Sequence, residues 1–308
     1  MRLEKGKFGI VLNKYLVSFL DYLKIQKNYS SHTISSYQRD ITDYYQYITS
    51  NNKDFLKITY PDAKQYLLYL YETKKEKATT VSRKISSLRS FYRFLANQGI
   101  TDNSAFDLLS LPKKEKKLPK YFEYNELEML FEVPDLKTPL GQRNALILEM
   151  LYATGIRVSE LVSLKVSDIH KGNMTIEVLG KGNKMRIVYF NKVTLNRLEL
   201  YLNDGYRLLN KKNSAYLFLN KSGEVLTTRG IEDILERIIK QTALKKNISP
   251  HMIRHSFATH LLNEGCDLLS VQELLGHSSL SATSVYTHIT TDRIKEVYLK
   301  AHPRARKK

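Results

Sequence analysis

Residues 175–190 read Thr-Ile-Glu-Val-Leu-Gly-Lys-Gly-Asn-Lys-Met-Arg-Ile-Val-Tyr-Phe and carry a clear β pattern. Two runs rich in β-branched residues, 175–179 and 186–190, flank the glycine-rich segment 180–184. Such an arrangement predicts two antiparallel strands joined by a tight turn. The apolar run Leu-Phe-Leu at 217–219 predicts a further short strand.

Helical periodicity surrounds this hairpin on both sides. Apolar residues recur three and four positions apart, which predicts amphipathic helices. The predicted helices cover 123–132, 140–154, 158–165, 193–210, 228–241, 251–264 and 268–275, with further helix toward the C-terminus. We therefore expect a mixed α+β domain over 121–308, mainly helical and with a small antiparallel sheet.

The N-terminal part of the chain has helical periodicity alone. Serine and threonine favour helix starts, proline fits a first turn, and glycine often ends a helix. Four helices are expected within 1–110: one containing 11–23, one beginning at Ser31 or Thr33, one beginning near Pro61, and one running from Thr79 or Thr80 to Gly99. Short connections between them predict a small helical bundle.

Residues 111–120, Leu-Pro-Lys-Lys-Glu-Lys-Lys-Leu-Pro-Lys, separate these two parts. Two prolines bracket a charged run that has no apolar face to bury, which is typical of a linker. A length of 308 residues also favours two domains. The predicted organisation is a helical domain over 1–110, a basic linker over 111–120 and a mixed domain over 121–308.

The chain is strongly basic, with 49 Lys and Arg against 31 Asp and Glu and a net charge of +18. A polyanion would relieve this self-repulsion, so nucleic acid is the leading candidate for a partner and a merely lysine-rich surface is the alternative. The single cysteine, Cys266, rules out an internal disulfide and fits a reducing compartment. The sequence contains no long apolar run or signal-peptide core, so we expect a cytoplasmic location without membrane association.

Four segments carry side chains suited to phosphate chemistry. They are 153–161 with Arg157, 180–184 with Lys181, 251–255 with His251 and Arg254, and 275–277 with His277, which Tyr286 follows nine residues later. Guanidinium groups, an ammonium group on a glycine-flanked turn and imidazoles together suit a phosphate that gains negative charge.

No metal or nucleotide motif accompanies these segments in the sequence. Paired cysteines, a dense carboxylate cluster and a G-x-x-x-x-G-K-[ST] loop are all missing from it. We therefore expect no metal and no cofactor. Phosphate chemistry of this kind needs a protein nucleophile, and a tyrosine phenol can form a covalent phosphodiester.

The ordered set Arg157, Lys181, His251-x-x-Arg254, Leu275-Gly276-His277 and Tyr286 closely resembles the motifs of the tyrosine recombinases, the phage-integrase family. The resemblance spans nearly the whole chain and implies a SAM-like helical core-binding domain, a linker and a mixed catalytic domain. The ending Val-Tyr-Leu-Lys-Ala-His-Pro-Arg-Ala at 297–305 is similar to that of the bacterial and archaeal Xer recombinases.

The resemblance implies a mechanism. Tyr286 attacks the scissile phosphate, forms a 3′-phosphotyrosine bond and releases a 5′-hydroxyl. Arg157 and Arg254 hold the non-bridging oxygens, and Lys181 protonates the leaving oxygen. Lys184 is a rival for the role of Lys181, which is preferred because Gly180 and Gly182 flank it.

Further residues complete the expected site. By the same resemblance, His251 assists as a general acid or base and His277 hydrogen-bonds the phosphate. Glu160, three residues after Arg157, is expected to support Arg157 or His251 from behind. Among 21 tyrosines, Tyr298 is the nearest competitor of Tyr286.

The resemblance also implies partners. The two domains would clamp a double-stranded DNA recombination site and form a homo-tetramer, or a hetero-tetramer with a related recombinase, exchanging residues 290–308 between neighbours. Xer recombinases resolve chromosome dimers, with a septal DNA translocase as a possible activator. Four cations close together on one predicted helix fit either DNA phosphates or a solvated face: Arg83, Lys84, Arg89 and Arg93.

Three alternatives stay open at this point. A mobile-element integrase or DNA invertase has the same chemistry and motifs. A type IB topoisomerase shares the chemistry but relaxes supercoils without a specific site. A DNA-binding protein that never cuts would have no use for Tyr286.

Overall fold

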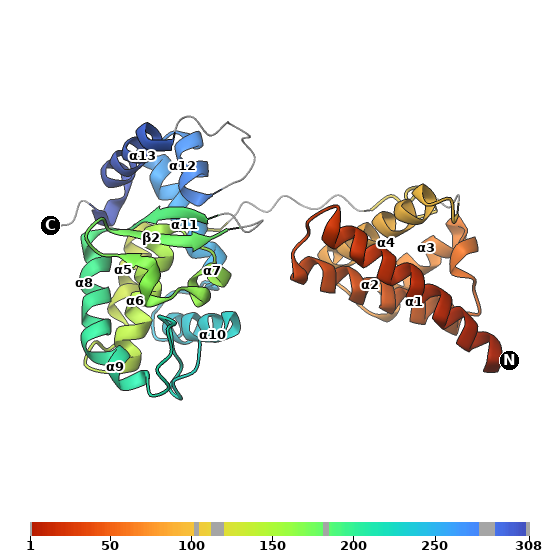
Figure 1. The fold of residues 1–308 in the computed structure, drawn as a ribbon, viewed down its shortest axis with the longest axis horizontal. Helices are drawn as coiled ribbons and strands as arrows, with labels where there is room; N and C mark the ends of the chain where they lie inside the picture. The colour runs from red at the N-terminus through yellow and green to blue at the C-terminus, as the bar shows by residue number, and fades with distance from the viewer. Residues whose placement is uncertain (1, 102–104, 112–119, 181–184, 277–286, 306–308) are drawn as a thin grey trace. The chain divides into compact units, whose positions relative to one another are not determined.

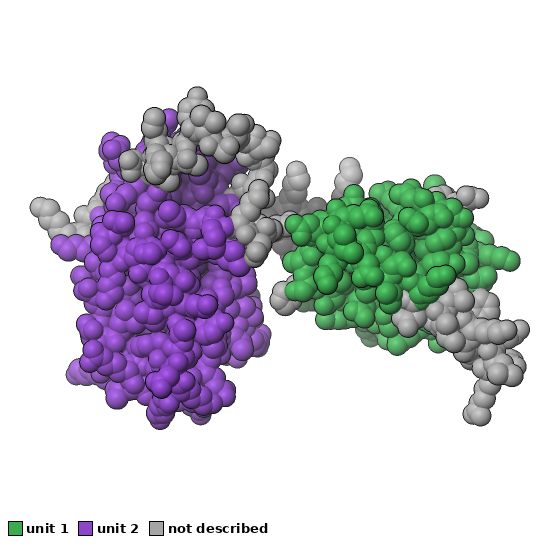
Figure 2. Space-filling model, in the orientation of Figure 1, with its two compact units in different colours: residues 1–117 green, residues 118–308 purple. Residues whose placement is uncertain are grey.

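The computed structural model describes residues 2–101, 105–111, 120–180, 185–276 and 287–305 (Figure 1). The chain divides into two compact units, Met1–Lys117 and Leu118–Lys308 (Figure 2). The boundary between them falls inside the range predicted as a linker, of which residues 112–119 lie outside the described residues.

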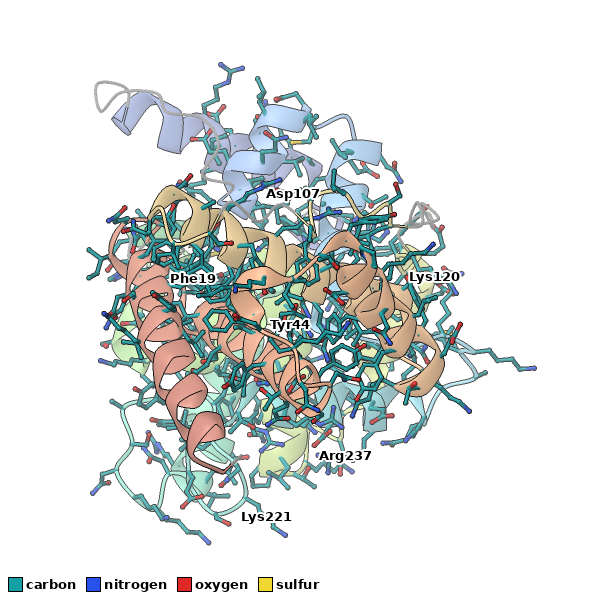
Figure 3. The ribbon with its side chains drawn as sticks, turned by 90° about the vertical axis from the view of Figure 1, so that its right-hand side faces the viewer. Phe19, Tyr44, Asp107, Lys120, Lys221 and Arg237 are labelled. Atoms are coloured by element: carbon teal, nitrogen blue, oxygen red, sulfur yellow. The ribbon has the colours of Figure 1, made fainter. Side chains whose placement is uncertain are left out.

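The first unit is a helical bundle. Its elements are α1 (Arg2–Ile25), α2 (Ser31–Ser50), η1 (Phe55–Lys57), α3 (Tyr60–Leu68), η2 (Tyr69–Thr73) and α4 (Ala78–Asn97). The Ser30 side chain accepts a hydrogen bond from the Thr33 amide and so begins α2. Buried aromatic side chains, among them Phe19 and Tyr44, fill the space between the helices (Figure 3). All four predicted helices are confirmed.

The second unit consists mainly of helices around one central helix. The helical elements are α5 (Tyr124–Glu132), α6 (Pro139–Thr154), α7 (Val158–Ser163), η3 (Val166–Asp168), α8 (Lys192–Leu200), η4 (Tyr201–Gly205), α9 (Tyr206–Leu209), α10 (Thr228–Ile239), α11 (Pro250–Asn263), α12 (Leu268–Leu275), α13 (Thr287–Ala301) and η5 (Pro303–Ala305). Helix α6 is buried along nearly its whole length and packs against α8 and α11 (Figure 1). Its mostly apolar sequence explains this central position.

A small antiparallel sheet lies against these helices, with the strand order β1 (Ile169–His170), β2 (Thr175–Leu179), β3 (Met185–Tyr189). The predicted hairpin of β2 and β3 is confirmed, with Val178 paired to Arg186. Strand β1 was not predicted, because two residues are too short to carry an alternating pattern.

The predicted strand at 217–219 is wrong. Leu217, Phe218 and Leu219 are fully buried, but the region forms only isolated bridges, Lys165 to Tyr216 and Leu219 to Val225. Any segment that crosses a hydrophobic core needs a short apolar run. Such a run therefore does not distinguish a strand from a buried connection. The predicted helix 193–210 contains the π-helical turn η4 at its centre.

Among the described residues, no helix combines the length and the hydropathy that crossing a bilayer requires.

Candidate active site

Gly155 brings Arg157 close to two other helices. It ends α6 in the left-handed conformation, with φ 58°, and Arg157 then begins α7 as its N-cap. A Cβ at Gly155 would lie 2.6 Å from Phe257 Cδ1 and 2.9 Å from Leu275 Cδ2. Glycine is therefore required twice here, for the backbone conformation and for the close approach of α11 and α12.

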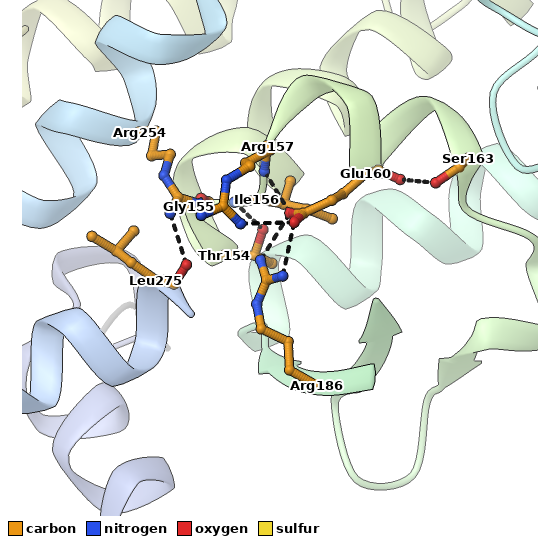
Figure 4. Close-up of polar contacts among 9 residues, drawn as sticks. All are labelled: Thr154, Gly155, Ile156, Arg157, Glu160, Ser163, Arg186, Arg254 and Leu275. Atoms are coloured by element: carbon orange, nitrogen blue, oxygen red, sulfur yellow. Dashed lines mark hydrogen bonds and ion pairs between the residues drawn. The ribbon is translucent and has the colours of Figure 1, made fainter. Parts of the chain in front are cut away.

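The Arg254 side chain, on α11, reaches the same end of α6. Its Nη1 donates to the Gly155 carbonyl and its Nη2 donates to the Leu275 carbonyl at 2.7 Å (Figure 4). Burial lowers the pKa of Arg254 to about 10; the neighbouring Arg157 charge adds to the shift and Glu160 opposes it. The guanidinium is still a cation at neutral pH, so two guanidinium groups from separate helices gather at the end of α6.

Glu160 supports Arg157 directly. Its Oε1 accepts from Arg157 Nη1 at 2.9 Å, and its Oε2 accepts from the Arg157 backbone amide at 2.9 Å. The Arg157 side chain is 36% exposed whereas that of Glu160 is 6% exposed, so the guanidinium is accessible to a ligand and its support is not. Arg157 is one of the two partners expected for Glu160.

A residue that the sequence did not single out completes this cluster. Arg186 on β3 binds Glu160 in a fork, Nη1 to Oε1 and Nη2 to Oε2, both at 2.8 Å (Figure 4). Burial raises the pKa of Glu160, but hydrogen bonds from Arg186 and the Arg157 amide outweigh burial and hold that pKa below its usual value. One signal was available: Arg186 lies two residues before buried Val188 and so shares the inward face of the strand with it.

Arg186 also contacts the end of α12. Gly276 caps that helix with φ 66°, and a Cβ there would lie 2.5 Å from both Cδ and Nε of Arg186. The Arg186 guanidinium therefore contacts both Glu160, which supports Arg157, and Gly276, the residue just before His277.

His251 lies in the first turn of α11, exposed and three residues before Arg254. Lys181 and Lys184, between β2 and β3, lie outside the described residues. His277 and Tyr286, between α12 and α13, also lie outside them.

Tyr298, the competitor of Tyr286, lies in the core of the second unit. Its side chain is fully buried, and its hydroxyl accepts from Asn191. Burial raises the pKa of this phenol well above its usual value. A buried phenol that stays protonated is a poor nucleophile for a large substrate.

The four cations on α4 all have partners within their own unit. Arg83 binds Asp40, Lys84 binds Asp43 and Glu76, Arg89 donates to the Phe106 and Leu109 carbonyls, and Arg93 binds Asp107. Lys84 is buried, whereas the Arg93 side chain is 68% exposed. Arg89 and Arg93 line a pocket of about 410 Å³ together with Lys27 and Tyr29.

Within the described ranges, no group of three His, Cys, Asp or Glu side chains could hold a metal ion. The expectation that the reaction needs no metal or cofactor stays a prediction.

Comparison with known proteins identifies the class. Residues 120–293 match the model of the phage integrase family, and residues 16–99 match that of the phage integrase N-terminal SAM-like domain. The chain belongs to the phage integrase family, the tyrosine recombinases.

Individual relatives narrow this class. The chain is 48% identical to the tyrosine recombinase XerC of Bacillus licheniformis over 96% of this chain and 98% of the relative. It is 47% identical to that of Anoxybacillus flavithermus over 96% of this chain and 99% of the relative. Its fold is similar to the XerH recombinase bound to difH DNA after cleavage, with TM-score 0.68 and 26% identity over 89% of this chain and 81% of that one. The activity is accordingly site-specific recombination of the Xer type, in which DNA is broken and rejoined.

Proposed function

We propose that this chain resolves chromosome dimers by recombining two copies of one chromosomal site during segregation. The observation that carries the proposal is the meeting of Arg157 and Arg254 at the end of α6, in a chain that matches XerC relatives over 96% of its length. Two fixed cations from separate helices form a site for one phosphate group.

The proposed reaction is a transesterification. The Tyr286 phenol oxygen bonds to the scissile phosphorus, and the bond from phosphorus to the 5′-oxygen breaks. Lys181 gives a proton to the departing 5′-oxygen, and the phenol proton passes to a base. A 5′-hydroxyl from another strand reverses these steps, so the energy of the bond is conserved and ATP is not consumed.

Arg157 and Arg254 stabilise the pentacoordinate phosphate through its non-bridging oxygens. The exposure of Arg157 supports this role, because a phosphate can reach it without displacing Glu160. Arg254 is held at both Nη atoms by backbone carbonyls, so its position is set before DNA binds. Preorganised charge of this kind costs no rearrangement during the reaction.

His251 and His277 complete the proposed site. The exposed position of His251, one turn before Arg254, supports a role as general acid or base. His277 is assigned a hydrogen bond to the phosphate, on the basis of its place after Gly276. Glu160 acts through Arg157, which it contacts twice.

In the first unit, we assign DNA phosphate contacts to the α4 cations Arg83, Lys84, Arg89 and Arg93. The exposed Arg93 and the pocket that it shares with Arg89 and Lys27 give the strongest support. Lys84 has the weakest support, because it is buried between two carboxylates.

The proposed working form is a tetramer on two DNA sites, of this chain alone or with a related recombinase. In a single chain, Ile294 and Tyr298 of the segment 290–308 are buried in the core of their own unit. Exchange between neighbours would form the same contacts with the next subunit, so no new surface is required. The proposal includes a cytoplasmic location and activation by a septal DNA translocase.

The leading alternative is the integrase or invertase of a mobile element, which has the same chemistry and a different DNA site. Identity to XerC relatives over nearly the full length favours the chromosomal role.

A covalent trapping assay tests the proposal. Protein is mixed, without metal or ATP, with nicked duplexes that carry candidate chromosomal sites and with a random duplex. We expect a covalent protein–DNA band on a denaturing gel that depends on the site and that Tyr286→Phe abolishes. A band on every duplex would indicate a topoisomerase instead, and a band retained by Tyr286→Phe would refute the assigned nucleophile.

A further inference from the structure

Arg186 is a partly buried arginine to which the function proposed above gives no role. Its side chain is only 16% exposed, and its two Nη atoms form the fork with Glu160. Its Nε is buried and has no hydrogen-bond partner among the described residues. An arginine that loses this much hydration without satisfying all its donors carries a cost, and some function must outweigh it.

The charges around Glu160 indicate what that function is. Glu160 is buried and contacts Arg157 at Nη1 and at the backbone amide, which fixes how that guanidinium points. A carboxylate 2.9 Å from Arg157 also offsets most of the attraction that Arg157 has for a phosphate. In an isolated Arg157–Glu160 pair, the carboxylate that orients Arg157 would therefore also weaken the attraction of Arg157 for a phosphate.

Arg186 removes this conflict. It adds a second positive charge to the same carboxylate, so the group of three side chains carries one net positive charge instead of none. Charge interactions are strong in a partly buried cluster because little water screens them. The exposed member of the group, Arg157, is the one that can present this charge to a ligand.

We propose that Arg186 is a positioning residue of the recombination reaction, which neutralises Glu160 so that this carboxylate orients Arg157 without cancelling its charge. The inference rests on the proposed function and deepens it. The contact between Arg186 and Gly276 extends the role, because it joins this charge cluster to the end of α12 that leads to His277.

Paired substitutions separate charge balance from a merely structural role. Arg186→Met removes the charge at similar volume and leaves Glu160 to cancel the charge of Arg157. Arg186→Met combined with Glu160→Gln removes both charges and leaves Arg157 with its own. Arg207→Met, on the exposed side of α9, is the matched control. Each variant is assayed for DNA affinity, for melting temperature and for the single-turnover rate of Tyr286-linked product at saturating protein.

We expect Arg186→Met to slow covalent product formation by about 10²-fold with DNA affinity nearly unchanged, because the loss falls on the transition state. The double variant is expected to be about tenfold faster than Arg186→Met, since no carboxylate then cancels the charge that Arg157 presents to the phosphate. A structural role predicts the opposite order, because the second substitution removes further hydrogen bonds. Arg207→Met should react like the parent.

Several outcomes would overturn the inference. It fails if folded Arg186→Met reacts at the parental rate, or if the folded double variant is no faster than the single one. If Arg186→Met does not fold, Arg186→Lys decides, because it keeps the charge and loses only the fork. We expect Arg186→Lys to react within about tenfold of the parent; a folded lysine variant that is about 10²-fold slower contradicts charge balance. Absence of Tyr286-linked product from the parent itself would instead refute the proposed function.

Discussion

Arg304 binds Glu149, 155 residues earlier in the chain, through two charged hydrogen bonds in the core of the second unit. Arg304 also donates to Glu128 at 2.6 Å and stacks over the Phe131 ring at 4.1 Å. The end of the chain is thereby fastened to α5 and α6, the helices that precede the active-site arginines.

This relationship predicts a large effect of Arg304→Met on stability. The substitution leaves Glu149 buried without its counter-charge, so the free energy of unfolding should fall by about 3–5 kcal/mol. Urea denaturation checks this value. Lys212→Met, which breaks an exposed pair with Glu224, is the control and should cost at most about 1 kcal/mol. Equal effects of the two substitutions would contradict the importance of burial.

Arg254→Lys is expected to reduce the rate of covalent product formation by about 10²-fold or more while DNA binding persists. Lysine keeps the positive charge but cannot donate to the Gly155 and Leu275 carbonyls at the same time. Single-turnover assays and a separate DNA-binding titration distinguish the two effects. A lysine variant as fast as the parent would mean that charge alone is enough at this position.

Gly155→Ala should destabilise the protein by more than about 1 kcal/mol. The added methyl group would collide with Phe257 and Leu275, and the left-handed backbone is strained for alanine. Gly172→Ala is the matched control, since a Cβ there meets nothing within 4 Å. Thermal melts of both variants test the prediction, which a near-neutral Gly155→Ala would refute.

Because of the buried side chain of His302, we expect the free energy of unfolding to fall in mild acid. Burial lowers the pKa of His302 to about 3 from its usual 6.5. Below pH 6.5 the unfolded chain therefore binds a proton that the folded chain does not, so stability falls as the pH drops toward 3. The slope should be about 1.4 kcal/mol per pH unit for this one group.

The check on His302 is a series of urea titrations between pH 6 and pH 4 for the parent and for His302→Gln. The variant should show a slope smaller by the contribution of one proton, whatever its stability at pH 7. His255 and His260, whose pKa values burial also lowers, remain in both proteins. The contribution of His255 cancels in the comparison, whereas His260 interacts with His302 and also lowers its pKa. Identical slopes would rule out a neutral buried imidazole at 302.

Arg93→Ala should weaken DNA binding and reduce the slope of log affinity against log salt by about 0.9, the contribution of one phosphate contact. Arg93→Lys is the control, because it keeps the charge and should keep the slope. Binding measured at several salt concentrations gives both values. An unchanged slope for the alanine variant would show that Arg93 serves its partner Asp107 and not DNA.

Local sequence patterns were enough to predict the helices and the hairpin and to identify the family, because periodicity, caps and short motifs lie within a few neighbouring residues. The same patterns misled at Leu217–Leu219, where burial depends on what the rest of the chain packs around them. The short strand β1 was missed for the related reason that its pairing with Thr175 and Ile176 defines it.

For the site, the ordered motifs and their family resemblance selected Arg157, Glu160, His251 and Arg254 as candidates, because each motif is continuous in the chain. The alternating pattern of the strand could place Arg186 on the inward face, but it could not reveal that the side chain meets the buried carboxylate of Glu160. Nor could the sequence reveal that each α4 cation has a partner in its own unit, such as Asp107 for Arg93. Those contacts join residues far apart in sequence, and only the packed fold brings their charges within reach of one another.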